Sequence, residues 1–396
     1  MCKKGLQSKV VYACKEELDI LRRMISLRRI KIVPNRIFFS TYQEAYTCNC
    51  KYIAEKILEK KLNYELVFSV SRDVCEHRKE YGIPDEIHLV ERYSRESFRL
   101  QASSKIWIDN GLNCIWKKVP KRSEQIYLNT WHGSLGIKRL SGSMHWKSVA
   151  RYGNHKIDYF LTNSKFDEQV FSQSFWPDVK QLKIGHPRND ILFHRQQWPE
   201  IHNKVYQWYG IDSHIKTLLY APTFRDDGNV EGLLHTFDFH GILQSCQARF
   251  GGTWMMLTRC HYHDMEKLAF HDGGEDQSCV MDVSDYPDMQ ELMAAVDLGI
   301  TDYSSWIFDF IFTEKPAFLY AEDANNYINQ RGFYYPLSES PFSIAEKTDQ
   351  LCRHIEQFDL QAYIQRCQRF LETRGCYETG DACERIIDFI QHETMK

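Results

Sequence analysis

The residues best suited to chemistry lie in short polar segments that directly follow apolar runs of the sequence. One of them, residues 129–138, contains His132 followed by Gly133. An imidazole titrates near neutral pH, and the glycine lets a substrate approach, so His132 is a candidate general base. Ser134 and Gly136 add backbone N–H groups that can bind an anion. A loop histidine bonded to a carbonyl group is the alternative interpretation of this pattern.

Residues 301–310 form a second segment, in which Ser304 and Ser305 precede an apolar helical run. Free backbone N–H groups and the positive end of the helix dipole favour a phosphate group at such a start. Asp309, one turn further on, can accept a hydrogen bond from a sugar hydroxyl. N-capping by Asp302 or Ser304 is the alternative, and we expect capping in either case.

Residues 257–263 form a third segment, again directly after an apolar run. Arg259 and His261 alternate along an extended chain, so both side chains point to the same side and can hold one diphosphate. His261 also forms an H-x-H pair with His263. Because no third ligand is nearby, we expect no metal site.

Two turns that contain proline add further charged groups. Residues 185–190 carry Arg188 and residues 221–227 carry Arg225, each beside carboxylates and after an apolar run. Both arginines are candidate anion ligands. Taken alone, each pattern is more typical of an ordinary surface turn.

Motifs of several other enzyme classes are absent from the sequence. It has no G-x-x-x-x-G-K-[ST] phosphate loop and no G-x-G-x-x-G fingerprint, which argues against kinases, GTPases and simple dehydrogenases. Without an Asp-x-Asp triplet, the metal-dependent single-domain sugar-nucleotide transferases are disfavoured. The G-x-S-x-G nucleophile elbow is absent as well.

The elements that must position these segments form an alternating α/β series. Apolar runs predict strands over residues 36–40, 65–70, 105–109, 125–129, 157–162, 217–221, 253–258, 280–283, 298–301 and 317–320. Amphipathic spacing predicts helices over residues 50–60, 198–210, 288–296 and 381–391. Strands separated by helical stretches indicate parallel sheets, and ligands bind beyond the carboxyl ends of such strands. We therefore expect two α/β halves that meet near residue 205.

Composition places the chain among soluble globular proteins. Its 396 residues are 43% hydrophobic and 26% charged, and this length favours two domains. No apolar stretch is long enough for a membrane span, and the first residues lack the apolar core of a signal peptide. The 13 cysteines include no C-x-x-C pair, so we expect reduced thiols and a cytosolic protein.

Charge is concentrated near the N-terminus. Residues 1–36 hold ten basic and three acidic side chains, whereas the whole chain has a net charge of −3 and is no candidate for nucleic-acid binding. Leu18, Leu21 and Ile25 share one face of a predicted basic helix, which can lie on an anionic membrane. The alternative is that this face packs on the protein itself.

Taken together and in this order, the segments resemble the CDP-glycerol glycerophosphotransferase family of teichoic-acid and capsule synthesis. The matching stretches span about residues 36–390: Trp131-His-Gly with Ile137-Lys138, Leu161-Thr-Asn-Ser, His186-Pro-Arg-Asn-Asp, Ala221-Pro-Thr-Phe-Arg-Asp, Arg259-Cys-His, Val283-Ser-Asp-Tyr-Pro-Asp, Ile300-Thr-Asp-Tyr-Ser-Ser with Phe308-Asp, and Arg331-Gly-Phe-Tyr. Any one of them is a weak signal, but the ordered set is specific.

The resemblance implies an α/β fold of GT-B type, in which two Rossmann-like domains face a cleft that holds the donor nucleotide. We divide the chain accordingly into a basic amphipathic segment (1–34), an N-terminal acceptor domain (35–205), a C-terminal CDP-donor domain (206–378) and a closing helix (379–396). The implied reaction is attack of an acceptor hydroxyl on the β-phosphorus of a CDP-alditol, with CMP leaving. It needs no metal and no cofactor beyond the donor.

Carried over residue by residue, the resemblance makes His132 and His261 the expected catalytic residues, with His132 taking the acceptor proton. Arg259 pairs with His261 on the diphosphate, while Ser304 and Ser305 hold phosphate oxygens. The other implied donor-binding residues are Gly133, Ser134, Leu135, Gly136, Arg188, Thr223, Phe224, Arg225 and Asp309. The sequence departs from the family pattern at Cys260, Tyr262 and Phe224, which affects packing more than chemistry.

The resemblance also implies partners and a location. CDP-glycerol is the expected donor and CDP-ribitol its alternative, while the acceptor is a lipid-linked glycan or polyol phosphate. The basic segment is then expected to contact the inner face of the cell membrane from the cytoplasm. The length resembles that of a primase or a compact capsule transferase more than that of a long polymerase. Two other classes stay open, a GT-B glycosyltransferase that uses a sugar nucleotide and a non-catalytic scaffold.

Overall fold

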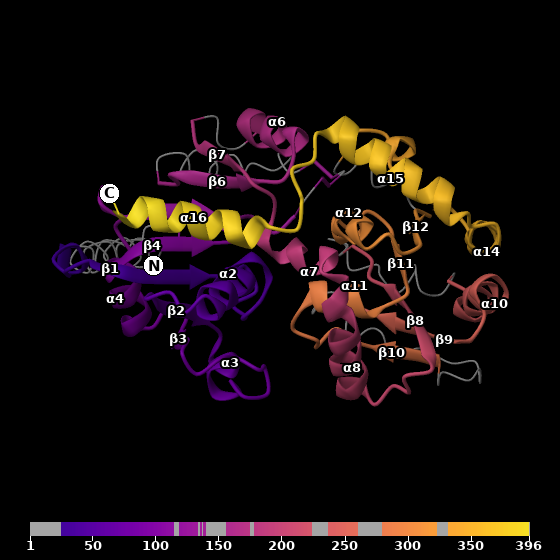
Figure 1. Cartoon of the computed structure of the whole chain (residues 1–396), viewed down its shortest axis with the longest axis horizontal. Coiled ribbons are helices and arrows are strands. Elements are labelled where there is room, and N and C mark those ends of the chain that lie inside the picture. Colours follow the sequence, from indigo (N-terminus) through magenta and orange to yellow (C-terminus); the bar gives the residue numbers. More distant parts are fainter. Residues whose placement is uncertain are drawn as a thin grey trace, which may run out of the picture.

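The computed structural model describes residues 25–114, 119–133, 135–136, 138–139, 156–174, 178–223, 237–259, 279–322 and 332–395. They are built around two parallel β-sheets (Figure 1). The strands are β1 (Val33–Ser40), β2 (Glu65–Val70), β3 (His88–Glu91), β4 (Ser104–Asp109), β5 (Ile126–Asn129), β6 (Tyr159–Thr162), β7 (Lys180–Lys183), β8 (Ile215–Tyr220), β9 (Thr253–Thr258), β10 (Val280–Asp282), β11 (Leu298–Thr301), β12 (Ala317–Tyr320) and β13 (Ser343–Ala345).

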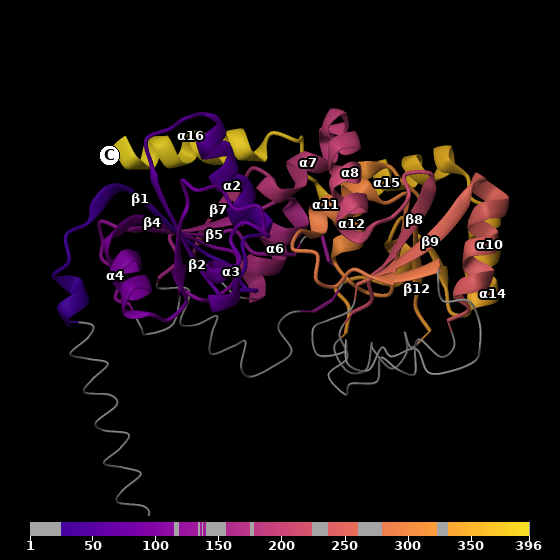
Figure 2. The ribbon, with the colours of Figure 1, turned by 90° about the horizontal axis from the view of Figure 1, so that it is seen from below.

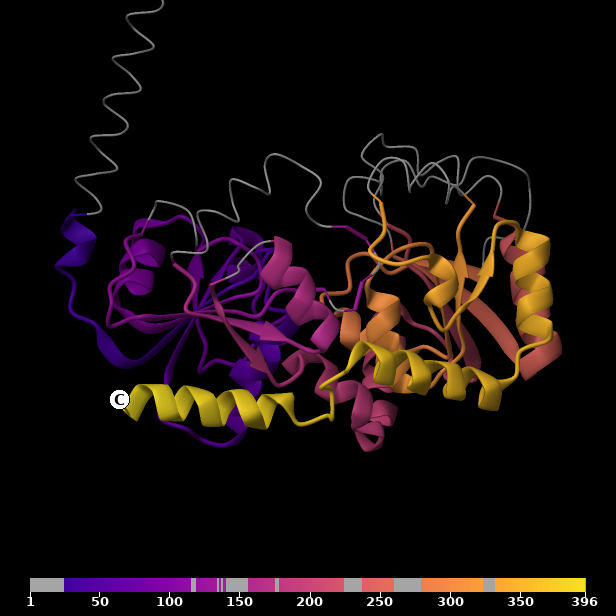
Figure 3. The same cartoon turned by 90° about the horizontal axis from the view of Figure 1, so that it is seen from above.

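Helices connect the strands and cover the sheets. They are α2 (Cys48–Glu59), α3 (Arg72–Glu76), α4 (Arg95–Ser103), α6 (Lys165–Ser174), α7 (Asp190–Phe193), α8 (Trp198–Tyr209), α10 (Phe239–Phe250), α11 (Met289–Ala295), α12 (Trp306–Phe310), α14 (Thr348–Glu356), α15 (Leu360–Arg374) and α16 (Ala382–Met395), with the 3₁₀ turn η1 (Pro187–Asn189) before α7. Figures 2 and 3 show the two sheets side by side along the long axis, with helices on both faces of each.

Both sheets have the strand order of a doubly wound α/β fold. The first runs β3-β2-β1-β4-β5-β6-β7 and the second β10-β9-β8-β11-β12-β13, with every pair of neighbours parallel. The winding therefore changes direction between β1 and β4 and between β8 and β11. Ligands bind beyond the carboxyl ends of the strands at such switch points. The loops after these four strands are thus where the fold leaves room for a site.

The strands that flank the switch points are buried on both faces, which is why they appear in the sequence as continuous apolar runs. Phe39 of β1 stacks on Phe68 of β2, with ring centroids 4.7 Å apart, in a core that includes Ile57 of α2. The next residue back along β1, Phe38, points to the opposite face and packs with Phe98 of α4. Helices thus pack against both faces of the first sheet.

The C-terminal helix returns to the first sheet. After α15, which packs in the core of the second sheet, α16 lies along the seven-stranded sheet (Figure 3). Ile386, Ile387 and Ile390 are buried in the core of that first sheet. The hydroxyls of Tyr64 and Thr394 are 3.0 Å apart and share a hydrogen bond. The end of the chain therefore ties its two halves together.

Every apolar run that predicted a strand forms one, with ends that differ by at most three residues. The structure adds three strands that the sequence pattern missed: β3, β7 and β13. All three are edge strands of their sheets. An edge strand needs no continuous apolar run because only part of it is covered, and β7, Lys-Gln-Leu-Lys, has exposed or half-buried residues throughout.

The predicted basic helix lies largely in residues 1–24, outside the described part of the chain. Just after this segment, Leu27 is buried in the core beside the first sheet, and Ile25 is exposed. A guanidinium nitrogen of Arg122 donates to the carbonyl groups of Arg28 and Ile30, at 3.1 and 2.6 Å. Among the helices that the structure describes, none is both long and apolar enough to cross a bilayer.

Candidate active site

His132 lies in the loop that follows β5, at the carboxyl edge of the first sheet. The backbone N–H of Trp131 donates to Asn129 Oδ1 at 2.9 Å, and Trp131 takes a left-handed backbone conformation with φ of 54°. His132 Nδ1 lies 2.6 Å from the carbonyl oxygen of Asn110, in the loop after β4. Since a carbonyl oxygen only accepts, Nδ1 carries the proton. Nε2 therefore carries the free lone pair. This neutral tautomer is the one that a general base needs.

Two aromatic rings stack on the imidazole of His132. Tyr42 stacks on it with ring centroids 5.0 Å apart and planes inclined by 13°, and Trp131 stacks at 4.6 Å and 26°. His132 is an exposed residue, but protein atoms surround its ring closely on the sides that face the molecule. The desolvation that they cause, with a smaller contribution from the positive charge of Arg188, lowers the pKa of His132 to about 4. The imidazole is therefore neutral at pH 7.

The segment around His132 also contacts the second half of the chain. A Cβ atom added at Gly133 would lie 3.5 Å from Ser305 Oγ, so only a small residue leaves this approach open. The carbonyl oxygen of Leu135, a predicted donor-binding residue, accepts from the hydroxyl of Tyr335 at 2.8 Å. These contacts bring the predicted base next to the predicted phosphate-binding serines.

The loops after β8 and β11 of the second sheet are tied to each other by Asp302. Its Oδ1 accepts from the backbone N–H of Thr223 at 2.8 Å and from that of Tyr303. The expectation that Asp302 or Ser304 caps the next helix is wrong. The helix α12 has Ser305 at its N-cap position without a side-chain capping bond, because the Asp302 carboxylate is used between the loops.

Ser304 and Ser305 are both half-buried at this strand end. Lys138, from the first half, donates from Nζ to the hydroxyl of Thr223 at 3.3 Å. Thr223 is itself buried. The predicted donor-binding residues Gly133, Thr223, Ser304 and Ser305 are thus gathered where the two switch points face each other.

Arg259 follows β9 at the same edge of the second sheet. Its guanidinium donates to the carbonyl oxygen of Tyr286 at 2.6 Å and to that of Val283 at 3.4 Å. Burial lowers the pKa of Arg259, but an arginine stays charged at any physiological pH. The residues Ser134, Phe224, Arg225 and His261 lie outside the described part of the chain, and their roles stay predictions.

Arg188 and Asp309 form an ion pair that joins the two halves. The Arg188 guanidinium donates from Nε and from a terminal nitrogen to Asp309 Oδ2, at 3.1 and 2.9 Å, and Asn189 Nδ2 donates to Asp309 Oδ1 at 3.0 Å. Burial opposes the charge on Arg188, but Asp309 and the neighbouring Cys48 raise its pKa on balance. Arg188 is only 2% exposed, so it is not the surface-turn residue that its local pattern favoured. Donor contact by either residue stays a prediction.

Glu378, between α15 and α16, belongs to the same buried network and was not found by sequence reasoning. Its Oε1 accepts from the side-chain amides of Asn163 and Asn189, at 3.1 and 2.9 Å, and from the backbone N–H of His186 at 3.0 Å. Burial and the nearby negative charge of Asp309 raise the pKa of Glu378 to about 8. No local pattern marks this glutamate, because its partners come from distant segments.

A second cluster of charges between the halves was also missed. Lys51 of α2 donates to Asp288 Oδ2 at 2.6 Å and to Glu291 Oε1 at 2.7 Å, and all three side chains are at most 10% exposed. Lys204 of α8 also pairs with Glu291, at 2.7 Å. Tyr52 completes the cluster with a bond from its hydroxyl to Asp288 Oδ1 at 3.1 Å. We name Lys51, Tyr52, Lys204, Asp288 and Glu291 the interdomain charge cluster.

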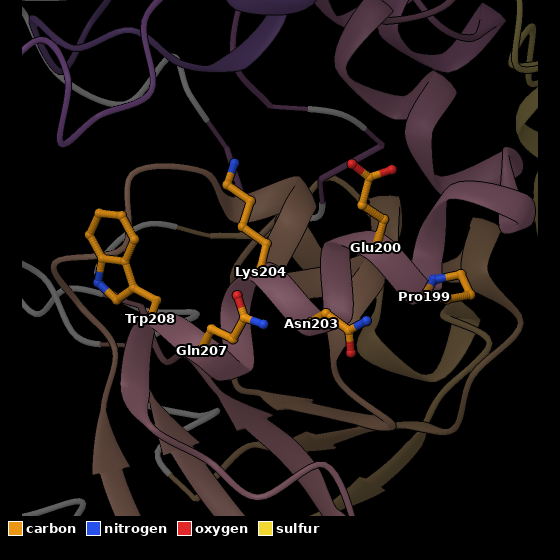
Figure 4. A pocket seen from close by; sticks show the side chains of 6 residues that line it. All are labelled: Pro199, Glu200, Asn203, Lys204, Gln207 and Trp208. Atoms are coloured by element: carbon orange, nitrogen blue, oxygen red, sulfur yellow. The ribbon is translucent and has the colours of Figure 1, made fainter.

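Close to this cluster lies an open hollow of about 660 Å³ on the outer side of α8 (Figure 4). Its lining side chains all come from that helix: Pro199, Glu200, Asn203, Lys204, Gln207 and Trp208. None of them was a predicted site residue. The strand ends around His132 therefore remain the candidate active site.

The chain is similar to known proteins of one family. The model of one protein family, described as CDP-glycerol:poly(glycerophosphate) glycerophosphotransferase, matches residues 21–392. A teichoic acid poly(glycerol phosphate) polymerase of Staphylococcus epidermidis is 28% identical over 92% of this chain. The chain spans about half of that relative, 51% of its length. A teichoic acid ribitol-phosphate primase of Bacillus spizizenii is 31% identical over 69% of this chain and 71% of its own length.

A solved structure shows the same similarity in three dimensions. The wall teichoic acid polymerase TagF superposes with a TM-score of 0.78 and 26% sequence identity, covering all of this chain and 99% of the solved one. A variant of TagF was also solved after a soak with CDPG. The similarity therefore extends over both sheets and the C-terminal helix.

Proposed function

Because the chain belongs to the CDP-glycerol:poly(glycerophosphate) glycerophosphotransferase family, we propose that it transfers a polyol phosphate from a CDP-alditol to an acceptor hydroxyl. The acceptor oxygen forms a bond to the β-phosphorus, and the bond from that phosphorus to the bridging oxygen of CMP breaks. The acceptor proton moves to His132 Nε2, and CMP leaves with the electron pair of the broken bond. The observation that carries this proposal is the neutral His132, with a free proton-accepting nitrogen, beside Ser305 of the other half.

The surroundings of His132 support its role as the base. Its bond to the Asn110 carbonyl group fixes the tautomer, and its lowered pKa of about 4 keeps it unprotonated at neutral pH. A base with so low a pKa is weak in solution, so its contribution depends on being held next to the acceptor hydroxyl. We assign orientation and proton removal to His132, and no proton donation at neutral pH.

The second half supplies the groups that stabilise charge on the transferred phosphate. A phosphoryl-transfer transition state spreads negative charge over the phosphate oxygens, and fixed donors stabilise it. Arg259 holds a positive charge at the end of β9, and Ser304 and Ser305 place hydroxyls at the end of β11. His261 joins them in the proposal as the partner of Arg259 on the diphosphate.

The architecture that we assign is of GT-B type. Two doubly wound sheets with adjoining switch points, and a C-terminal helix that returns to the first sheet, support this assignment. The acceptor domain then comprises residues 35–205, the CDP-donor domain 206–378 and the closing helix 379–396. In this arrangement the base and the phosphate-binding groups come from different domains, so the donor must bind between them.

For the substrates, we propose CDP-glycerol as donor and a lipid-linked glycan or polyol phosphate as acceptor. The family description and the glycerol-phosphate relatives support glycerol, and the ribitol-phosphate primase keeps CDP-ribitol as the alternative. The concentration of basic residues in the first 36 positions supports attachment to the inner face of the cell membrane. Sedimentation with phosphatidylglycerol vesicles at low and high salt tests that attachment, which salt should weaken.

The donor is tested by CMP release. The purified chain is incubated with CDP-glycerol, CDP-ribitol or a UDP-sugar, each with a soluble analogue of a lipid-linked disaccharide acceptor. Release of CMP from CDP-glycerol alone supports the proposal. Release from CDP-ribitol alone would mean that the donor is CDP-ribitol and that ribitol phosphate is transferred. Nucleotide release from the UDP-sugar alone would contradict polyol-phosphate transfer and favour a glycosyltransferase.

A further inference from the structure

Tyr42 is an exposed aromatic residue beside the proposed base. It lies two residues beyond the end of β1, and 57% of its surface is exposed. Its ring nevertheless lies nearly parallel to the His132 imidazole, with centroids 5.0 Å apart and planes at 13°. An exposed ring is free to take several rotamers, so a parallel stack on one polar partner requires a constraint on its backbone.

The backbone of Tyr42 has that constraint. Its N–H donates to the side-chain Oδ1 of Asn110 at 2.7 Å, and the carbonyl oxygen of the same Asn110 is the acceptor for His132 Nδ1. Gly111 packs against Tyr42 so closely that an added Cβ would lie 3.3 Å from Tyr42 Cα. Asp109 holds this loop by accepting from the Gly111 N–H at 2.8 Å. Hydrogen bonds and close packing thus connect the loops after β1, β4 and β5 around His132.

We infer that Tyr42 is a positioning residue for His132, which fixes the orientation and tautomer of the imidazole through ring stacking and through Asn110. The inference rests on the proposed function, because it deepens the role of His132 as the base. Tyr42 touches no reacting atom in this account. It acts by stacking on the imidazole, as Trp131 also does.

The charged and titratable groups around His132 define the expected pH effect. Arg188 acts on it from η1, His132 and the nearby His186 influence each other electrostatically, and the rings of Tyr42 and Trp131 cover part of the imidazole. Arg188 stays in place when Tyr42 is removed, whereas the shielding on one face is lost. The protonated imidazole then becomes easier to solvate, so its pKa should rise from about 4 toward the ordinary value of 6.5.

The test compares Tyr42→Ala with Tyr42→Phe, which keeps the ring. We expect Tyr42→Ala to lower kcat by about 10- to 100-fold with little change in the KM for CDP-glycerol, because misplacement of the base affects the chemical step. The acid limb of its pH–rate profile should move upward, toward pH 6.5. Tyr42→Phe should retain nearly normal kcat. Tyr93→Ala is the control, since Tyr93 is 45% exposed just beyond strand β3, two strands away from β1, and the Arg92 guanidinium lies over its ring.

A second readout works without any turnover. In protein labelled with ¹³C at the histidine ring carbons, the His132 signal is assigned by its loss in His132→Gln and is followed through a pH titration. Tyr42→Ala should raise the titration midpoint, and Gly111→Ala should raise it as well by displacing the Tyr42 backbone. Unchanged midpoints in both variants would overturn the positioning role. If the wild type releases no CMP from any CDP-alditol, the proposed function fails while this titration still decides about Tyr42.

Discussion

The chemistry of His132 is determined by its immediate neighbours. Trp131 adopts a left-handed backbone conformation, which costs a non-glycine residue on the order of 1–3 kcal/mol and persists only where other contacts enforce it. Here the enforcing contacts are the Asn129 side chain, which accepts from the Trp131 N–H, and the aromatic stack. The strain turns the chain sharply after β5. It thereby places the imidazole against the Asn110 carbonyl group.

At the residue scale, Glu378 gives a prediction about pH. Its pKa is about 8 in the folded chain and 4.5 as a free side chain, because burial and Asp309 disfavour its charged form. A group whose pKa is raised by folding contributes stability that is complete below pH 4.5 and is lost progressively up to pH 8. We therefore expect Glu378→Gln, which cannot ionise, to gain stability relative to wild type across this window, by up to about 1.4 kcal/mol per pH unit.

Urea denaturation at pH 5, 6, 7 and 8 measures this difference. His132 and His186 also make the free energy of unfolding depend on pH, but they do so in both proteins, so their effect cancels in the comparison. Glu59→Gln, at an exposed position of α2, should show no such trend. A difference between Glu378→Gln and wild type that stays constant from pH 5 to 8 would show that Glu378 is ionised in the folded protein.

At the scale of elements, the sequence predicted all the interior strands and the edge strand β10 but missed the other three edge strands. Strands β1, β2, β8 and β9 lie inside their sheets and appear as apolar runs because helices cover both faces. Strands β3, β7 and β13 lie at edges, and each is only three or four residues long. Backbone pairing with one neighbour is sufficient for them. Their side chains therefore leave little pattern to recognise.

The candidate site was predictable to the extent that it follows strand ends. His132, Ser304 and Ser305 could be proposed together because polar residues after buried strands of a parallel sheet must meet at one edge. The partners of Lys51 were not predictable, since Asp288 lies 237 positions away in the sequence. A lysine on an amphipathic helix has the same local pattern whether it faces solvent or a buried carboxylate.

Asp190 provides a prediction about the docking of α16. Its carboxylate accepts from the backbone N–H groups of Ala382 and Cys383, at 2.9 and 2.7 Å, and so satisfies the first turn of this helix. We expect Asp190→Ala to lower the free energy of unfolding by about 1–2 kcal/mol. Hydrogen exchange should become faster at the start of α16. Exchange measured by mass spectrometry on intact protein checks this.

The matched control is Asp359→Ala, which removes an equivalent capping bond from α15, where Asp359 accepts from the Ala362 N–H at 3.0 Å. It should accelerate exchange at the start of α15 and leave α16 unchanged. Equal protection of α16 in wild type and Asp190→Ala would mean that its buried isoleucines hold the helix without this cap.

At the scale of the whole molecule, buried polar contacts connect the two halves. The interdomain charge cluster and the Arg188–Asp309 pair both join the first sheet's side of the molecule to the second. Buried ion pairs contribute little net stability compared with apolar packing, but they are specific in geometry. We interpret them as fixing how the two switch points face each other. In the proposed function, that relation decides whether His132 and Ser305 can act on one substrate.

Removal of Lys51 should therefore be costly. Lys51→Met leaves Asp288 and Glu291 buried with one positive partner fewer, and we expect a loss of about 3–5 kcal/mol in unfolding free energy. Arg72→Met, which breaks the exposed ion pair between Arg72 and Glu76, should cost less than about 1 kcal/mol. Denaturation monitored by tryptophan fluorescence compares the two variants. Equal losses would contradict a joining role for the cluster.

The role of His132 as the base is tested most directly by comparing wild type with His132→Ala. CMP release from CDP-glycerol is measured with an acceptor analogue, and donor binding is measured by calorimetry on the same preparations. Because a positioned general base contributes about 100- to 10,000-fold, turnover should fall by that factor while the Kd for the donor changes little. Normal turnover by His132→Ala would contradict the assignment of His132 as the base and, with it, this account of the site.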